Sequence, residues 1–157
     1  MTGTNRLNSW FWLLLMLLVF PTSAVWAEPG GDYVGSDACR ECHPDQYKSF
    51  KANSKKAGSY KHVKVMRKGL TDDEFKACLE CHTTGYGHPG GFVSEEITPL
   101  MAEAGCEVCH GPGGNHVQSG EPDDIKADIT TRDCEGCHNP ERVEAFNFKP
   151  LIYGGAH

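Results

Sequence analysis

Cys106-Glu107-Val108-Cys109-His110 decides the fold of this chain, because its pattern, C-x-x-C-H, occurs four times in 157 residues. The pattern is typical of covalent attachment of a c-type haem. Two thiols three residues apart lie on one face of a helical turn and can bond to one haem edge, and the adjacent histidine can bind the iron. The sequence therefore predicts four haems c. The attachment cysteines are Cys39, Cys42, Cys78, Cys81, Cys106, Cys109, Cys134 and Cys137, and the proximal iron ligands are His43, His82, His110 and His138.

Other uses of paired cysteines fit this pattern less well. A single C-x-x-C is compatible with a thioredoxin-like redox pair, and two together are compatible with a zinc site. Neither accounts for a histidine directly after every pair. All eight cysteines lie in the four motifs, so none remains for a disulfide, a zinc site or a catalytic nucleophile.

Residues 1–27 have the pattern of a secretory signal peptide, which leaves residues 28–157 as one tetrahaem domain. Arg6 provides a positive start, Trp10–Phe20 is an apolar run of eleven residues, and Ala27 suits cleavage. The alternative is an uncleaved anchor, but a bilayer span needs about 20 apolar residues. Only that alternative gives the protein a membrane contact. Export to the periplasm also fits the chemistry, since haem is attached covalently outside the cytoplasm.

The composition leaves little material for an ordinary hydrophobic core. Hydrophobic residues make up 39% of the chain, and all three tryptophans fall within the predicted signal peptide. A domain of this length normally buries more apolar side chain. We therefore expect short helices and long loops wrapped around the haems, which supply the missing apolar surface, and we expect the haem-free chain not to fold.

The chain is acidic, with a formal net charge of −6 that becomes −7 when Arg6 is removed with the signal peptide. This balance argues against nucleic-acid binding. A basic segment nevertheless spans residues 48–68. Its cations are Lys48, Lys51, Lys55, Lys56, Lys61, Lys64, Arg67 and Lys68. They are compatible with a docking face for an acidic partner, with counterions for haem propionates, or with a solvated helical face.

Capping patterns place each motif on a helix. Ser36 or Asp37 begins a helix that runs through the first motif toward Lys51, with Pro44 as a possible break. Thr71–Glu74 is a capping box for the second helix, and residues 85–91 form a glycine-rich loop. The other two helix starts are Thr98-Pro99, for a third helix through Cys106–His110, and Thr130 or Thr131, for the fourth.

The second axial ligand decides what each haem can do, since a six-coordinate iron suits electron transfer and an open position admits small molecules. Four histidines lie outside the motifs, namely His116, His157, His62 and His88. Their number permits histidine on both sides of every iron. His116 is the first choice, because the glycine turn after His110 can fold it back over a ring. Met66 and Met101 are alternatives, although methionine at helical spacing more often packs in a core.

Three longer stretches, 33–39, 81–92 and 109–116, resemble the tetrahaem cytochrome c-554 family of multihaem c-type cytochromes. The resemblance implies a mainly α protein with four closely stacked haems that relays electrons between redox partner proteins in the periplasm. It also implies distal ligands at His116 and His157. Family members often carry a histidine after a Ser-Lys pair, where this chain has Lys56 after Ser54-Lys55. Either His62 takes over that role or one haem lacks an internal ligand.

Three functions follow from these observations. The first is an electron carrier with mostly bis-histidine haems, which is not an enzyme. The second is a reductase of nitric oxide or a related nitrogen compound. It would use one open haem, for which the haem on Cys78, Cys81 and His82 is the candidate, because the family includes one open site. The third is a subunit of a haem filament or larger redox complex, in which a neighbouring chain supplies a ligand.

Overall fold

The computed structural model describes residues 31–139, which contain all eight cysteines and the four motif histidines. Every regular element among them is a helix, and no strand occurs in this part of the chain. The α-helices are α2 (Ser36–Cys39), α3 (Pro44–Asn53), α4 (Ser59–Lys64), α5 (Asp72–His82), α6 (Glu107–His110), α7 (Gly114–Ser119) and α8 (Thr131–Glu135). Four 3-10 helices are η1 (Lys55–Gly58), η2 (Arg67–Gly69), η3 (Pro99–Met101) and η4 (Pro122–Asp124). The predicted mainly α fold of short helices joined by long loops is confirmed.

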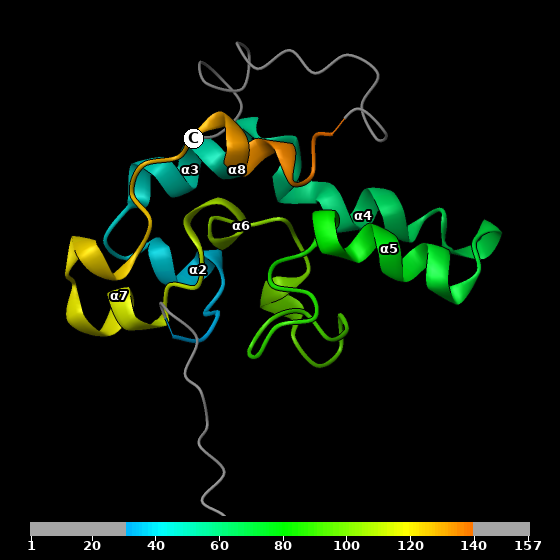
Figure 1. Ribbon diagram of the computed structural model, residues 1–157, viewed down its shortest axis with the longest axis horizontal. Coiled ribbons are helices and arrows are strands. Elements are labelled where there is room, and N and C mark those ends of the chain that lie inside the picture. The colour runs from blue at the N-terminus through cyan, green and yellow to red at the C-terminus, as the bar shows by residue number, and fades with distance from the viewer. Residues whose placement is uncertain (1–30, 140–157) are drawn as a thin grey trace, which may run out of the picture.

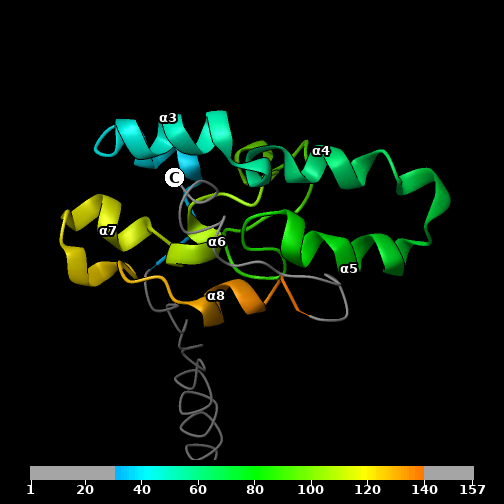
Figure 2. The same cartoon turned by 90° about the horizontal axis from the view of Figure 1, so that it is seen from above.

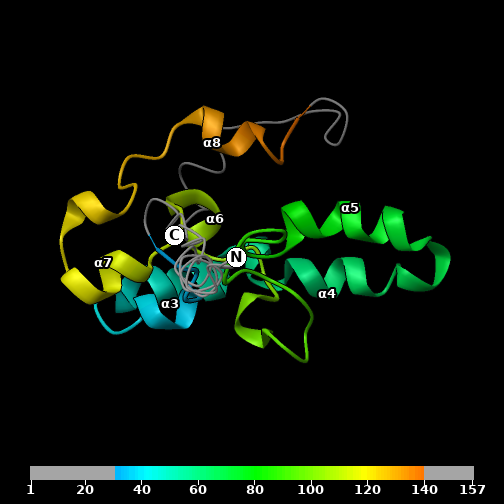
Figure 3. The ribbon, with the colours of Figure 1, turned by 60° about the horizontal axis from the view of Figure 1, so that its bottom comes forward.

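The helices are arranged around α6. Figure 1 shows α4 and α5 side by side as an arm at one end and α7 at the other, and Figure 3 shows the same separation. Helices α3 and α8 overlap in Figure 1, but the view from above places them on opposite sides of α6 (Figure 2). The third motif, carried by α6, therefore lies in the middle of the described chain.

The predicted helix starts are largely confirmed, with two interruptions. Thr71 and Glu74 form the expected reciprocal capping box at the start of α5, and Thr130 with Asp133 does the same for α8. The first helix stops at Cys39 and a new one begins at Pro44, since proline fits the first helical position but not a helix interior. The helix expected to run from Thr98 through the third motif is wrong in extent: η3 ends at Met101, and α6 starts separately.

The hydrophobic core is small and lies on one side of the molecule. Its buried cluster consists of Tyr60, Val63, Leu79, Phe92, Met101 and Ala102. These side chains come from α4, α5, the loop that joins α5 to η3, and the end of η3 with the residue after it. The Tyr60 and Phe92 rings lie 5.2 Å apart. The first, third and fourth motifs contribute no member to this buried cluster. A core this limited agrees with the expectation that bound haems supply much of the apolar interior.

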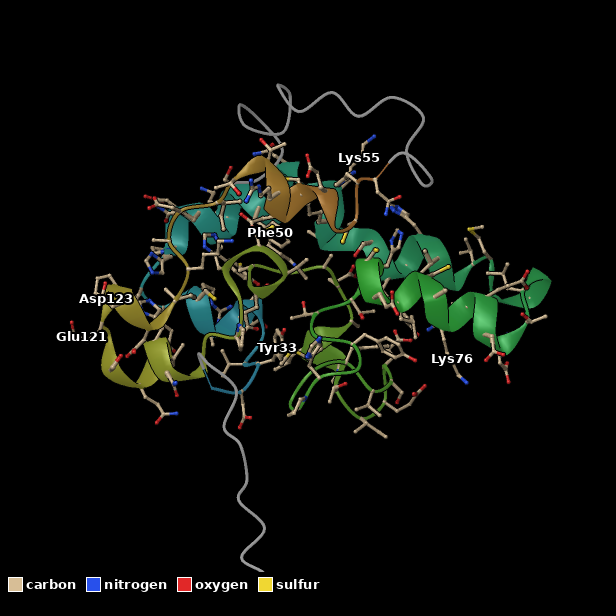
Figure 4. All side chains as sticks on the ribbon, in the orientation of Figure 1. Tyr33, Phe50, Lys55, Lys76, Glu121 and Asp123 are labelled. Atoms are coloured by element: carbon tan, nitrogen blue, oxygen red, sulfur yellow. The ribbon has the colours of Figure 1, made fainter. Side chains whose placement is uncertain are left out.

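The segment between the second and third motifs, residues 83–105, is held by buried hydrogen bonds. Ser59, buried at the start of α4, donates to the His82 carbonyl at 2.8 Å and accepts from the Ala104 amide at 2.8 Å. Gly91 is required sterically, because a Cβ there would lie 1.7 Å from the Gly85 carbonyl oxygen. Figure 4 shows Tyr33 against this loop. The two motifs are thus fixed relative to each other.

Some predicted features fall outside residues 31–139. These are the signal peptide at residues 1–27, the first residues of the domain and His157. Within the described range, no helix has the length and apolar character needed to cross a bilayer.

Candidate functional site

Each C-x-x-C-H motif forms one turn of helix, as its spacing predicts. The histidine amide donates to the carbonyl of the first cysteine at 2.8 Å in the first motif, 3.1 Å in the third and 2.8 Å in the fourth. The second motif is the last turn of α5. None of the eight cysteines, all within the described residues, forms a disulfide. A turn of this kind brings two thiols and an imidazole to one side of the backbone, which is the donor set that a c-type haem requires.

Two histidines have the hydrogen bonds typical of metal ligands. His110 Nδ1 lies 2.7 Å from the Lys126 carbonyl oxygen, and His116 Nδ1 lies 2.8 Å from the Glu121 carbonyl oxygen. Because a carbonyl can only accept, Nδ1 donates in both cases. The lone pair of each neutral ring is then on Nε2. Metal-bound histidines are commonly oriented by such a bond from the other ring nitrogen.

The geometry also brings His43 of the first motif opposite His116 on α7. The two ring centroids are 6.2 Å apart and the ring planes differ by 21°. An imidazole nitrogen binds a transition metal at about 2.0–2.1 Å and lies roughly 1 Å from its ring centre, so two axial ligands of one iron place their centroids about 6 Å apart. The residues present therefore fit a haem iron held between His43 and His116.

The first and third motifs are in direct contact. A hydrogen bond between the Cys39 and Cys106 side chains raises the pKa of the Cys39 thiol and lowers that of Cys106. These titrations belong to the haem-free chain, since in the haem-bound form both sulfurs are thioethers. The Cys106 amide also donates to the Ser36 hydroxyl at 3.0 Å. The two attachment turns are thus joined at their first cysteines.

The third and fourth motifs are neighbours, and so are the fourth and second. Burial raises the pKa of Cys109, and the nearby Cys134 and Asp133 add to this rise while Lys56 opposes it. Burial lowers the pKa of His138, and Lys56 and His82 lower it further. These proximities fit a row of attachment turns in the order first, third, fourth, second, with the second also linked to the third through Ser59.

The other predicted distal ligands are more scattered. His62 lies exposed on α4, and His88 lies exposed in the loop after α5, where its ring is 6.3 Å from that of Tyr33. Met66 is 55% exposed, whereas Met101 belongs to the buried core. The structure brings His116 to a motif histidine, and the roles of His62, His88 and His157 stay predictions.

A cavity of about 340 Å³ lies beside the end of α5 and the start of α6. Tyr33, Thr83, Tyr86, His88 and Glu107 are among the residues around it, and none of its lining residues is a motif cysteine or a motif histidine. Its volume is at the low end of small-molecule sites, which span roughly 300–1,000 Å³. Glu80 of the second motif and Glu107 and Val108 of the third also line it, so the cavity borders these two attachment turns.

The basic segment 48–68 is mostly solvated. Lys64 forms an ion pair with Glu95, and Arg67 forms one with Asp72. Lys56 is half-buried and faces the third and fourth motifs through the interactions described above. The remaining members, Lys48, Lys51, Lys55, Lys61 and Lys68, are exposed. Lys48 and Lys51 lie on α3, Lys55 on η1, Lys61 on α4 and Lys68 on η2.

Sequence reasoning missed Glu107, a buried residue with 2% exposure inside the third motif. Glutamate also occurs inside the other three motifs, at Glu41, Glu80 and Glu135, where it is exposed. Nothing in the sequence distinguishes the buried copy. The carbonyl groups of Lys126 and Glu121 that orient the two histidines were missed as well, since any residue can supply a backbone carbonyl.

Residues 38–111 match the protein family described as cytochrome c554 and c-prime. A similar relative is cytochrome c-554 of Nitrosomonas europaea, 34% identical over 87 residues, which are 48% of this chain and 36% of that protein. The match thus spans about a third of the relative's length. A solved structure titled the reduced state of cytochrome c554 from Nitrosomonas europaea superposes with a TM-score of 0.58. It shares 22% identity and covers 80% of this chain and 85% of that chain, a likeness of fold.

Proposed function

We propose that this chain, whose residues 38–111 match the family described as cytochrome c554 and c-prime, is an extracytoplasmic electron carrier of that family with four covalently bound haems. A haem c supplies one-electron chemistry when it is bound. The eight motif cysteines would attach the four groups, and His43, His82, His110 and His138 would be the proximal ligands. The four attachment turns described above support this assignment.

The observation that carries the proposal is the spacing between His43 and His116. Ring centroids 6.2 Å apart with planes differing by 21° fit the two axial ligands of one iron. The hydrogen bond from His116 Nδ1 to the Glu121 carbonyl leaves the lone pair of the neutral ring on Nε2, the nitrogen that would bind the iron. Two fixed imidazoles stay in place when the iron changes oxidation state, which suits electron transfer and keeps small molecules out.

The contacts between the attachment turns also support a carrier. The row runs from the first motif through the third and fourth to the second. Cofactors held on neighbouring turns lie close together, so charge can pass along the row without leaving the protein. The two ends of the row, at the first and second motifs, are the candidate points of entry and exit.

The basic segment 48–68 is the candidate docking surface for one redox partner. Two of its exposed lysines, Lys48 and Lys51, lie on α3, which begins directly after His43 of the first motif. In a chain with a net charge of −6, such a concentration of positive charge orients the encounter with an acidic protein. The signal-like residues 1–27 and the need for haem attachment outside the cytoplasm support an encounter in the periplasm.

The experiment that tests the proposal compares the holoprotein with a His116→Ala variant. Mass spectrometry should give four haems in both proteins. Carbon monoxide titration of the reduced proteins counts open irons, and the variant should bind one more molecule than the wild type. His62→Ala, which changes an exposed histidine on α4, measures the same quantity at another distal candidate.

Two results would contradict the proposal. Fewer than four bound haems in protein from a maturation-competent host removes its premise. An unchanged carbon monoxide count in His116→Ala removes the assignment of His43 and His116 to one iron. The alternative function, nitric oxide reduction, requires an open iron in the wild type, and the same titration measures that directly.

A further inference from the structure

Glu107 is a buried acid whose two oxygens accept three backbone hydrogen bonds. Oε1 accepts from Val34 N at 3.0 Å and from Gly113 N at 2.8 Å, and Oε2 accepts from Gly35 N at 2.7 Å. Both oxygens serve as acceptors, which is the pattern of a carboxylate. Glu107 is 2% exposed, so these hydrogen bonds are shielded from water. Breaking these hydrogen bonds leaves backbone amides without partners and so lowers the stability of the fold, whereas loss of an exposed glutamate would leave no such amides.

The three amides belong to the two segments that hold the first haem. Gly35 is the N-cap of α2, which carries Cys39. Gly113 is the N-cap of α7, which carries His116 one helical turn later. Glu107 itself lies inside the third motif, next to Cys106. One side chain therefore connects the attachment helix of the first motif, the helix of its distal ligand and the attachment turn of the third motif.

Neighbouring bonds make this connection rigid. The Cys106 amide donates to the Ser36 hydroxyl at 3.0 Å, and the Gly114 amide donates to the Asp32 carbonyl at 3.0 Å. Gly111, with φ of 77°, turns the chain sharply between His110 and the start of α7. The position of α7 is thus fixed from two sides, with the Glu107 carboxylate as its charged contact.

We propose that Glu107 is a positioning residue that holds His116 against the iron facing His43 and whose negative charge lowers the reduction potential of that haem. The inference rests on the proposed function, because it needs the iron between these two histidines. A buried negative charge favours the oxidised, more positive iron, and in a low dielectric its effect is screened little. Hydrogen bonding and burial around a haem are recognised means of setting its potential.

The test uses Glu107→Gln in the holoprotein, with Glu135→Gln as the matched control. Glu135 occupies the same place in the fourth motif and is exposed. Glu107→Gln should retain four haems, raise one midpoint potential in a spectroelectrochemical titration and bind one additional carbon monoxide, because His116 is released. Glu107→Asp keeps the charge on a shorter side chain, so it should restore the potential more than the ligation. Glu135→Gln should match the wild type in both measurements.

Hydrogen exchange of the wild-type holoprotein covers the case in which Glu107→Gln does not mature. The amides of Val34, Gly35 and Gly113 should exchange slowly, since they donate to a buried carboxylate. Rapid exchange at all three overturns the inference, and so do wild-type potential and carbon monoxide binding in Glu107→Gln. If His116→Ala opens a site but Glu107→Gln does not, only this inference fails. If His116→Ala opens none, the proposed function fails first.

Discussion

Ser59→Ala tests whether one hydroxyl fixes the second motif relative to the third. The Ser59 hydroxyl is buried, donates to the His82 carbonyl and accepts from the Ala104 amide, each at 2.8 Å. Ala104 is 2% exposed, so its amide has no access to water once the hydroxyl is removed. The substitution therefore breaks a link between the end of α5 and the residues that lead into Cys106.

The expected size of the effect follows from these two bonds. A buried donor without a partner costs about 1–3 kcal/mol, and an ordinary hydrogen bond contributes about 0.5–1.5 kcal/mol. The higher helix propensity of alanine at the start of α4 offsets a few tenths of a kcal/mol. Ser59→Ala should thus lower the free energy of unfolding by about 1–4 kcal/mol.

Guanidinium denaturation of the holoprotein, followed by far-UV circular dichroism, measures this loss as a lower midpoint at unchanged slope. Ser49→Ala is the control, because the Ser49 hydroxyl on α3 accepts only an exposed hydrogen bond, from the Asn53 side-chain amide at 3.2 Å. This substitution should change the free energy of unfolding by less than about 0.5 kcal/mol. A Ser59→Ala midpoint equal to that of Ser49→Ala would refute the reasoning.

Three further predictions concern the haems, the charges and pH. Protein produced without haem attachment should show no cooperative melting transition by circular dichroism, since the buried cluster of six residues is too small to support the fold; a sharp transition would contradict this. Lys48→Glu with Lys51→Glu should slow electron transfer with an acidic redox protein and flatten its dependence on ionic strength, whereas Lys76→Glu, on α5 (Figure 4), should do neither. Lys126 and then the Thr130 amide hold the pKa of Asp133 at about 2, below its ordinary 3.8, so this carboxylate stabilises α8 above about pH 4 and the effect is lost as pH falls toward 2. Acid titration by circular dichroism should show this loss in the wild type and not in Asp133→Asn.

The local elements were predictable from the sequence because their signals are local. Thr71 with Glu74 and Thr130 with Asp133 cap their helices through side chains three residues apart. The C-x-x-C-H spacing likewise contains its own helical turn. The extent of the third helix was not predictable in the same way. Thr98-Pro99 carries a valid start signal, but the chain after Met101 is shaped by distant partners, among them Ser59 bonded to the Ala104 amide.

The candidate site likewise contains features with a local sequence signal and features that depend on distant contacts. His116 was singled out from the glycine turn after His110, and the structure places its ring opposite His43. The importance of Glu107 was not predictable, since all four motifs contain a glutamate and two of the three bonds that distinguish this one come from amides more than 70 residues away. The order of the motifs in space also differs from their order in the chain, because it depends on how α6 and α8 pack.

The central location of α6 has a consequence for how the molecule stores charge. The third turn contacts the first through Cys106 and lies near the fourth at Cys109. Loss of the third haem would leave the first haem isolated from the fourth and second, so that the two groups would be reduced and oxidised at separate rates. Time-resolved reduction of such a protein would split into two independent phases, where the intact row equilibrates as a single pool.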